Sequence, residues 1–252
     1  KSGHITSYGT VLYCISFTGK LLFMSGEARD TIPYREFIKG KIPQDEIPMY
    51  ISRMSLDEIE RLKRYYSNKS DQSYFSELWA DMWINKNTRM YTDLYEESHN
   101  MKKFRTNFDK YNNNKKPRIF TKGRPKEFES KTVAAKRETY EEAKIPKNII
   151  RLSDIKPLCE QYIGNDGKKY QTVLYCGSIP YIPKRSYIRP HNPQLRKKCI
   201  SGEVTEIYWE EFDVLYGKLD ENKRKVLKEF YLQILELEKK KLGKGLEILP
   251  IQ

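Results

Sequence analysis

The sequence predicts an α+β protein in which an all-α helical segment is inserted into a sheet-forming domain. A hairpin pattern of apolar and β-branched residues lies near the N-terminus, a helical period begins at Ser55, and strand-like runs return after residue 117. A chain of 252 residues is long enough for two packed units. We therefore expect one domain over residues 1–36 and 114–252, and an inserted helical domain over residues 37–113.

The first predicted element is a β-hairpin. Residues 8–17 are rich in apolar and β-branched side chains, and residues 21–24 resume the same pattern. Between them, the Thr-Gly-Lys of residues 18–20 supplies a turn. Two strands are therefore expected here, and the pattern changes only after Pro33.

The middle of the chain is predicted to be helical. Ser55 and Glu58 have the spacing of a capping box, in which a serine and a glutamate three residues later satisfy the first amides of a helix. Apolar residues then recur at spacings of three and four: Leu56, Ile59, Leu62, Phe75, Leu78, Trp79, Met82, Trp83, Tyr91, Leu94, Met101, Phe104 and Phe108. This aromatic stripe is more typical of a small helical core than of a base-stacking surface.

The last third of the chain alternates between strand and helix patterns. Residues 112–117, Asn-Asn-Asn-Lys-Lys-Pro, form a polar junction of the kind that joins domains. In order, we expect a strand at 118–120, a helix at 130–144 stopped by Pro146, a hairpin at 162–180 that turns at 164–167, a strand at 203–209 and a helix at 222–242. The apolar side of the last helix comprises Leu227, Phe230, Leu232, Ile234, Leu235 and Leu237.

Composition narrows the class of protein. The four cysteines lie far apart and have no paired-ligand spacing, so we expect a reducing compartment, with neither a disulfide framework nor a zinc site. No run is apolar enough to span a bilayer and no signal peptide is evident, so a cytoplasmic protein without a membrane partner is expected. The net charge of +13 favours a polyanionic partner, although charge alone does not distinguish RNA, DNA, inositol phosphates and an anionic membrane.

A cluster of glutamates on the 130–144 helix points to metal chemistry. Glu138, Glu141 and Glu142 share one helical face, and like charges at such spacings disfavour a helix by roughly 0.2 to 0.5 kcal/mol per pair. A cation between the carboxylates would remove that cost. Because the ligands are all oxygens, Mg²⁺ or Mn²⁺ is the expected ion.

The spacing of these residues resembles the Nudix box, the signature of the Nudix hydrolases. Its glycine, four glutamates and arginine are matched in register by Gly123, Glu129, Arg137, Glu138, Glu141 and Glu142. Two positions depart from the family pattern: Thr139 stands where an aliphatic residue is usual, and Lys144 replaces the second glycine. The alternative, an ordinary exposed helix of glutamates and lysines, does not require this register.

The resemblance implies a Nudix fold, a mixed sheet between helices, and hydrolysis of a pyrophosphate attached to a nucleoside. It implies that Glu138, Glu141 and Glu142 hold the metal, Glu129 binds it directly or through water, and Arg137 orients a ligand carboxylate. Lys122 and Arg124 would contact substrate, although Lys122 could equally be a solvated loop lysine. The general base would be Glu203, with Glu206 in reserve, or else Glu203 is an ordinary strand-end carboxylate.

The segments beside the box resemble the mRNA-decapping Nudix enzymes of large cytoplasmic DNA viruses. Residues 122–127 and 129–130 are similar to the box opening in the African swine fever virus type, residues 29–38 to a poxvirus segment, and residues 81–85 to the swine fever insertion. This implies hydrolysis of the 5′ cap to m⁷GDP and 5′-monophosphate RNA, in the host cytoplasm or a virus factory, with packaging in the virion as a further option.

A capped RNA would need basic and aromatic side chains. One basic cluster comprises Lys115, Lys116, Arg118, Lys122, Arg124 and Lys126, and another comprises Lys184, Arg185, Arg189, Arg196, Lys197 and Lys198, with Tyr181 and Tyr187 between. Tyr34, Tyr170 and Tyr175 are candidates to stack on the cap guanine, with core packing as the alternative. A strand that continued through Tyr34 would place its ring on the side of Ile32.

Two other functions remain open at this point. A diphosphoinositol polyphosphate or dinucleoside polyphosphate hydrolase would use the same glutamates on small anionic substrates. A non-catalytic RNA-binding module is the second alternative, which the complete set of box glutamates disfavours. The sequence does not indicate an oligomeric state.

Overall fold

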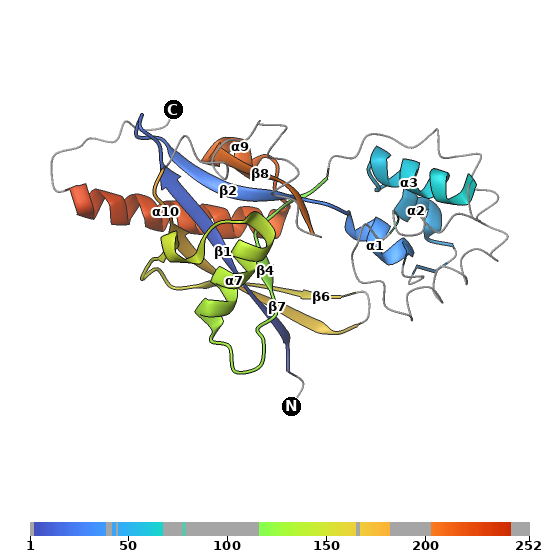
Figure 1. Ribbon diagram of the computed structural model, residues 1–252, viewed down its shortest axis with the longest axis horizontal. Coiled ribbons are helices and arrows are strands. Elements are labelled where there is room, and N and C mark those ends of the chain that lie inside the picture. The colour runs from blue at the N-terminus through green and yellow to red at the C-terminus, as the bar shows by residue number, and fades with distance from the viewer. Residues whose placement is uncertain are drawn as a thin grey trace. The chain divides into compact units, whose positions relative to one another are not determined.

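The chain divides into two units in the computed structural model (Figure 1). The structure describes residues 3–38, 42–43, 45–67, 78, 116–164, 167–181 and 203–242. The sheet unit comprises Lys1–Glu27, Arg118–Ser201 and Glu206–Gln252, and the helical unit comprises Ala28–Pro117 and Gly202–Thr205. The insertion thus begins after Glu27, earlier than the sequence suggests, because residues 32–38 are helical and pack with the helical unit.

The sheet unit is built on a mixed eight-stranded sheet, and the predicted α+β class is confirmed. Its main order is β3-β2-β1-β7-β5, with β4 paired to β1, β6 to β7 and β8 to β2. The strands are β1 (Ile5–Ile15), β2 (Leu21–Ala28), β3 (Arg118–Ile119), β4 (Lys122–Gly123), β5 (Arg151–Leu152), β6 (Leu158–Ile163), β7 (Lys169–Ser178) and β8 (Val204–Glu211). The two predicted hairpins, β1–β2 and β6–β7, are confirmed, and Gly19 and Gly167 supply the positive φ in their turns.

The central pairing joins the two hairpins. Strands β1 and β7 are parallel, with a register that runs from Ile5 opposite Tyr170 to Tyr13 opposite Ser178. The C-terminal half of β1 pairs with β2, and its N-terminal half pairs with the short β4 through Tyr8 and Gly9. Strand β1 therefore links the sheet to the loop that contains Gly123.

Helices cover both faces of this sheet (Figure 1). Thr10 of β1 contacts Thr139 of α7 (Lys131–Ala143), whereas its neighbour Val11 packs in the core cluster with α10 (Glu221–Leu242). Because successive side chains of a strand point to opposite faces, α7 and α10 lie on opposite sides of β1. A short 3₁₀ turn (Lys147–Ile149) follows α7, and α9 (Phe212–Tyr216) precedes α10.

The main core lies between the sheet and α10. Its fully buried members include Phe23, Phe120, Leu227, Phe230 and Ile234. The predicted apolar side of α10 is confirmed at Leu227, Phe230 and Ile234 and is wrong at Leu232, which is 48% exposed because it falls outside the stripe that these three residues define.

The described part of the helical unit contains α1 (Ile32–Ile38), α2 (Ile47–Ile51) and α3 (Leu56–Ser67). The Glu58 carboxylate accepts hydrogen bonds from the amides of Ser55 and Thr31, so one side chain anchors the starts of α3 and α1. The predicted capping box is half formed, because the Ser55 hydroxyl donates to Asp57 Oδ1 at 2.8 Å. Except for the buried Leu78, the helices expected at 75–108 lie outside the described residues.

Two absences hold for the described residues only. No helix there is long and apolar enough to cross a membrane. Cys14, Cys159 and Cys176 are free thiols, and Cys199 lies outside the described ranges.

Candidate active site

The glutamates of interest lie on α7, whose two ends are well defined. Ser130 is the N-cap, and its hydroxyl oxygen accepts from the Val133 amide at 3.4 Å. At the other end, Lys144 adopts φ 58° and ψ 22°, the left-handed conformation for which glycine is preferred at a helix end. Lys144 therefore ends the helix in the conformation that a glycine would adopt, although it departs from the box pattern at this position. Its ammonium donates to the Glu141 carbonyl at 2.7 Å.

A buried group of threonines fixes α7 on the sheet. The Thr139 hydroxyl donates to the Ala135 carbonyl at 2.9 Å, and its oxygen lies 2.7 Å from the Thr10 hydroxyl and 2.9 Å from the Thr121 hydroxyl. A hydroxyl has one hydrogen and two lone pairs, so Thr10 and Thr121 act as donors to Thr139. All three residues are fully buried, which explains a threonine where an aliphatic residue is usual.

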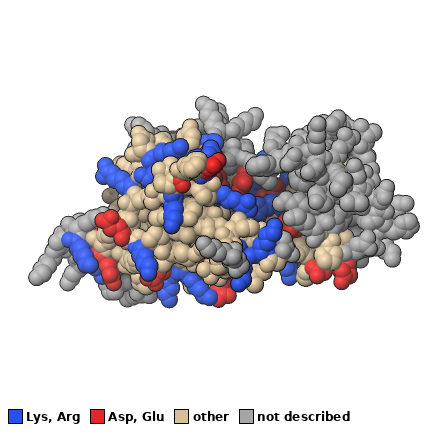
Figure 2. Space-filling model, turned by 90° about the horizontal axis from the view of Figure 1, so that it is seen from below, with Lys and Arg blue, Asp and Glu red and all other residues tan. Residues whose placement is uncertain are grey.

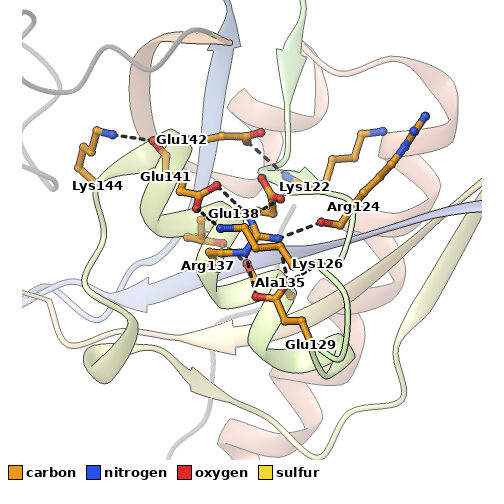
Figure 3. Close-up of polar contacts among 11 residues, drawn as sticks. Lys122, Arg124, Lys126, Glu129, Ala135, Arg137, Glu138, Glu141, Glu142 and Lys144 are labelled. Atoms are coloured by element: carbon orange, nitrogen blue, oxygen red, sulfur yellow. Dashed lines mark hydrogen bonds and ion pairs between the residues drawn. The ribbon is translucent and has the colours of Figure 1, made fainter.

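Arg137 is the centre of the glutamate cluster (Figure 3). Its Nε and Nη2 donate to the two oxygens of Glu129 at 2.8 and 2.9 Å, a bidentate pair. Its Nη1 donates to Glu138 at 2.6 Å and to Glu141 at 2.8 Å, and Nη2 also donates to the Arg124 carbonyl at 2.9 Å. Arg137 thus holds three glutamates and the loop in one arrangement, as expected of an orienting residue.

Gly123 is required by its distance to Glu138. A Cβ at position 123 would lie 2.1 Å from the carboxyl carbon of Glu138 and 2.2 to 2.3 Å from its oxygens. Any side chain at position 123 would therefore displace this carboxylate. The match to the box glycine has a steric cause, since the backbone of β4 forms one wall beside Glu138.

Glu142 joins the cluster from the next position of α7. It is buried, and its Oε2 accepts from the Lys122 amide at 3.3 Å. The Lys122 ammonium lies 3.2 Å from the Thr172 hydroxyl and 5.7 Å from the centre of the Tyr162 ring. The expected phosphate contact of Lys122 stays a prediction, because this ammonium already has a hydroxyl partner.

The cluster carries more negative than positive charge. Three carboxylates, those of Glu129, Glu138 and Glu141, contact the guanidinium of Arg137, and Glu142 adds a fourth beside the Lys122 amide. The Lys126 ammonium lies 3.9 Å from Glu141. The two bonds from Arg137 and one from the Lys126 amide lower the pKa of Glu129 to about 2, and the Glu129 pairing raises the pKa of Arg137. The excess negative charge suits a cation, which would compete with Arg137 for the Glu138 and Glu141 oxygens.

In the conformation shown, the carboxylates turn toward Arg137. Within the described ranges, no three acidic, histidine or cysteine side chains are spaced to hold an ion as they stand. Because Glu129 already has both oxygens engaged by Arg137, it acts first as a partner of that arginine, and its role as a metal ligand stays a prediction.

The predicted general bases lie on β8 and just before it. Glu203 precedes β8 and belongs to the helical unit, where its carbonyl accepts from the Arg29 amide at 2.8 Å. Glu206 lies in the sheet unit, and its carboxylate accepts a hydrogen bond from the Tyr208 hydroxyl. Neither assignment is tested by these contacts.

The tyrosine predictions have different outcomes. The segment that includes Tyr34 does not continue as a strand: Pro33 stands in the first turn of α1, a favoured proline position, and the segment is helical. The Tyr34 ring is fully buried and its hydroxyl donates to the Leu78 carbonyl at 2.8 Å, which leaves no open face for a base. Tyr175 is half-buried, and Tyr170 stacks on Tyr162 with ring centres 5.4 Å apart.

The first basic cluster is only partly exposed. The Lys116 side chain is 14% exposed and lies 2.8 Å from Asp57, and the Arg118 guanidinium is buried 3.2 Å from the centre of the Tyr208 ring. Of the described members, Arg124 and Lys126 are exposed on the loop before α7. The predicted RNA contacts of Lys115, Lys184, Arg185 and Arg189 lie outside the described residues.

Three features near the site were missed from the sequence. Thr10 and Thr121 are the partners of Thr139, and Gly9 allows the crossing of β4, since a Cβ there would lie 2.2 Å from the Thr121 carbonyl oxygen. Phe128, beside Glu129, is 99% exposed and has φ 61°. The phenylalanine directly before the first box glutamate is the sign of this feature in the sequence.

No family model and no curated protein matches the chain. Similar solved structures include an Ap4A hydrolase of C. elegans in a binary complex, at 14% identity and TM-score 0.48, covering 92% of this chain and 98% of that one. Another structure of C. elegans Ap4A hydrolase has 13% identity and TM-score 0.44, covering 92% and 99%. The Nudix hydrolase RenU from M. smegmatis has 8% identity and TM-score 0.43, covering 92% and 87%. Because these identities and TM-scores are low, the chemistry of this chain has to be inferred from its own side chains.

Proposed function

We propose that this protein is a Nudix-type pyrophosphatase that uses Mg²⁺ or Mn²⁺ and removes the cap of RNA as m⁷GDP. The observation that carries this proposal is the cluster of three glutamates held by Arg137, with Gly123 packed against Glu138 and Glu142 at the next position of the helix. An exposed, solvated helix would not need a bidentate arginine pair, a buried Glu142 and a loop glycine that leaves no room for a side chain. The arrangement is that of a site that holds carboxylates in place.

The side chains of the candidate site have different proposed roles. Arg137 fixes Glu129 and the Arg124 carbonyl, and thereby fixes the loop against the helix. Glu138, Glu141 and Glu142 present oxygens near β4 and would hold the ion. Exposed Arg124 and Lys126 would attract the phosphates of the substrate. When bound, the divalent ion neutralises the charge that develops on the phosphates and activates a water.

Capped RNA is proposed as the substrate because the segments beside the box resemble those of decapping enzymes. The net charge of +13 suits a polyanion, and a long RNA can use basic side chains distant from the site. In the sheet unit, Lys and Arg side chains are spread over the face seen in Figure 2, with Asp and Glu among them. A dinucleoside polyphosphate or a diphosphoinositol polyphosphate is the alternative substrate, because the same glutamates would serve it.

The decisive experiment is a product assay. The purified protein with Mg²⁺ or Mn²⁺ should release m⁷GDP from capped RNA. If the protein releases phosphate from diphosphoinositol polyphosphate but no m⁷GDP from capped RNA, its substrate belongs to the alternative class. No hydrolysis of any of these substrates would leave a non-catalytic module and would overturn the proposal.

The glutamates are tested by neutral replacements. Glu141→Gln with Glu142→Gln should reduce turnover by at least about 100-fold, the scale of losing groups that stabilise transition-state charge. Glu127→Gln is the matched control, since Glu127 is an exposed glutamate of the same loop. Glu203→Gln and Glu206→Gln should separate the two candidates for the general base, because only one should abolish the acidic limb of the pH–rate profile, where protonation of the base lowers the rate.

A further inference from the structure

We propose that Phe128 is a stacking platform for a nucleobase of the substrate. The proposal rests on the proposed pyrophosphatase function and goes beyond it, because it names the part of the substrate that determines preference. A nucleotide would bind through both its phosphates and its base, whereas an inositol pyrophosphate would bind through phosphates alone.

The exposure of Phe128 is the first observation. Its side chain is 99% exposed, more than that of any other large hydrophobic residue of the described part, where Phe17 follows at 78%. Burial of an aromatic ring is favourable, so a ring left fully in water contributes nothing to the fold through packing. The ring is therefore available to a ligand.

The backbone of Phe128 is the second observation. Its φ of 61° lies in the left-handed region, where glycine or asparagine is preferred. The Glu129 amide donates to the Lys126 carbonyl at 3.1 Å, which closes a turn with Phe128 at its third position, a position that favours glycine when φ is positive. A large aromatic residue is thus held where the fold would prefer a residue without a side chain, as is common at functional sites.

The turn is rigid and adjoins the glutamates. The Lys126 amide donates to Glu129 Oε2 at 2.9 Å, and the same carboxylate is held by Arg137 at both oxygens. Phe128 is therefore presented from a fixed turn one residue away from the Arg137 cluster. Such pre-organisation reduces the ordering cost of stacking.

The charge around the turn selects the ligand class. Arg124 and Lys126 of the same loop are exposed, so the ring is accompanied by two cations. A ligand with a flat ring joined to phosphates, a nucleotide, would use both features, since every base has a face that stacks on an aromatic side chain. A peptide partner would use the ring but has no need of the glutamates.

The test compares two ligands that differ only in the base-bearing part. Binding of GDP and of inorganic pyrophosphate, each with Mg²⁺, is measured by calorimetry for the wild type, Phe128→Gly, Phe128→Trp and the control Phe17→Gly. Phe128→Gly should weaken GDP binding by roughly 5- to 150-fold, the range for one base stacked on an aromatic ring, and change pyrophosphate binding by less than about twofold. Phe128→Trp and Phe17→Gly should bind GDP like the wild type.

Three binding results would overturn the proposal: equal GDP affinity of Phe128→Gly and wild type, an equal loss for GDP and pyrophosphate, or no GDP binding by the wild type.

Thermal unfolding tests whether Phe128 has a structural role instead. Phe128→Gly should melt at or above the wild-type temperature, since glycine suits φ 61°, and a lower melting temperature would also overturn the proposal. Hydrolysis by the wild type is scored separately, so failure of the proposed pyrophosphatase function is distinguished from failure of the stacking role.

Discussion

Gly123 and Gly9 are both glycines because of close contacts, but what each meets is different. A Cβ at position 123 meets the end of the Glu138 side chain, which can rotate away. A Cβ at position 9 meets the backbone oxygen of Thr121 at 2.2 Å, which cannot move without displacing β4. The glycine at position 123 therefore leaves room for the Glu138 carboxylate, and the glycine at position 9 lets β1 and β4 approach closely.

Alanine at these two glycines should give opposite results. Gly123→Ala should unfold at nearly the wild-type temperature but lose about 100-fold in kcat, because displacing a catalytic group by about 1 Å can cost that much. Gly9→Ala should lower the free energy of unfolding by about 1–3 kcal/mol, as expected of overpacking. Thermal unfolding and turnover of a pyrophosphate substrate check both. A stable and fully active Gly123→Ala protein would show that Glu138 is not needed where the structure has it.

Sequence reasoning gave the register of the candidate site residues but not their mutual contacts. The register of Gly123, Arg137 and the glutamates followed from spacing along the chain, because helical geometry alone places 138, 141 and 142 on one face. That Glu129 gives both oxygens to Arg137 depends on how the loop folds back, for which no local pattern exists. Lys144 shows the same limit, since a lysine in a left-handed helix cap has no sequence signature.

At the scale of elements, α7 is attached to β1 by hydroxyls as well as by apolar packing. The Thr139 oxygen is the common acceptor for Thr10 and Thr121, which come from β1 and from the residue before β4. The helix, the central strand and the loop that leads to Gly123 thus share one buried junction. Rotation of α7 would break these bonds and move the glutamates together.

Loss of the Thr139 hydroxyl should lower the free energy of unfolding most while the Thr10 and Thr121 hydroxyls that donate to it remain. Thr139→Val keeps the shape and leaves two buried hydroxyls without their acceptor, so the free energy of unfolding should fall by about 1–3 kcal/mol. The triple variant with Thr10→Val and Thr121→Val should lose less than the sum of the three single changes, because replacing all partners removes the unsatisfied groups. Urea unfolding of the set checks this. Strictly additive losses would mean that the three hydroxyls do not act as one group.

Glu160 of β6 is a half-buried carboxylate whose Oε1 is buried and unsatisfied. Within the described residues its Oε1 has no hydrogen-bond partner, and burial raises its pKa above the usual 4.5. An acid with a raised pKa in the folded state destabilises the fold while ionised. Its cost is present above the raised pKa and disappears as the pH falls below 4.5, where both states are neutral.

Replacement of Glu160 should therefore act in a pH-dependent way. Glu160→Gln should melt above the wild type at pH 7, and the difference should shrink as the pH falls through the raised pKa and vanish below 4.5. Thermal unfolding at several pH values provides the measurement, and exposed Glu127→Gln serves as the control. A constant difference across this range would show that ionisation of Glu160 has no part in it.

The elements themselves could be predicted unequally well. Both hairpins and α7 were found because their patterns are local: alternating runs beside a glycine turn, and a helix between Ser130 and Lys144. The parallel pairing of β1 with β7 was not predicted, since residues 5–13 and 170–178 are far apart in the chain and their partners leave no local pattern. The conformation at Tyr34 was left open for a related reason: a short run around Pro33 suits a strand or a helix, and tertiary packing decides for the helix.

At the scale of the whole molecule, the dominant property is the charge of +13. Several of the basic residues that seemed available to RNA have partners in the structure, such as Lys116 with Asp57 and Arg118 with the Tyr208 ring. Figure 2 shows further Lys and Arg side chains spread over one face of the described part of the sheet unit, with Asp and Glu among them. A long RNA should therefore be bound through many weak contacts.

Salt dependence measures these contacts directly. The affinity for a long capped RNA should fall with salt at a log–log slope of about −2 or steeper, which corresponds to three or more phosphates at about 0.7 each. A capped dinucleotide should show a shallower slope, because it reaches only the glutamate loop. Filter binding at salt concentrations from roughly 50 to 300 mM measures both slopes. Identical slopes for both ligands would mean that no charge outside the loop contacts RNA.

The parallel pairing of β1 and β7 also determines when the protein can fold during synthesis. Residues 5–13 leave the ribosome before their partners at 170–178, which emerge only after the Ala28–Pro117 part of the helical unit has been made. Closing so long a loop is slow, and the nascent β1 edge stays unpaired until then. Translation stalled before residue 170 would therefore leave an aggregation-prone intermediate, for which a chaperone on the nascent chain is the natural protection.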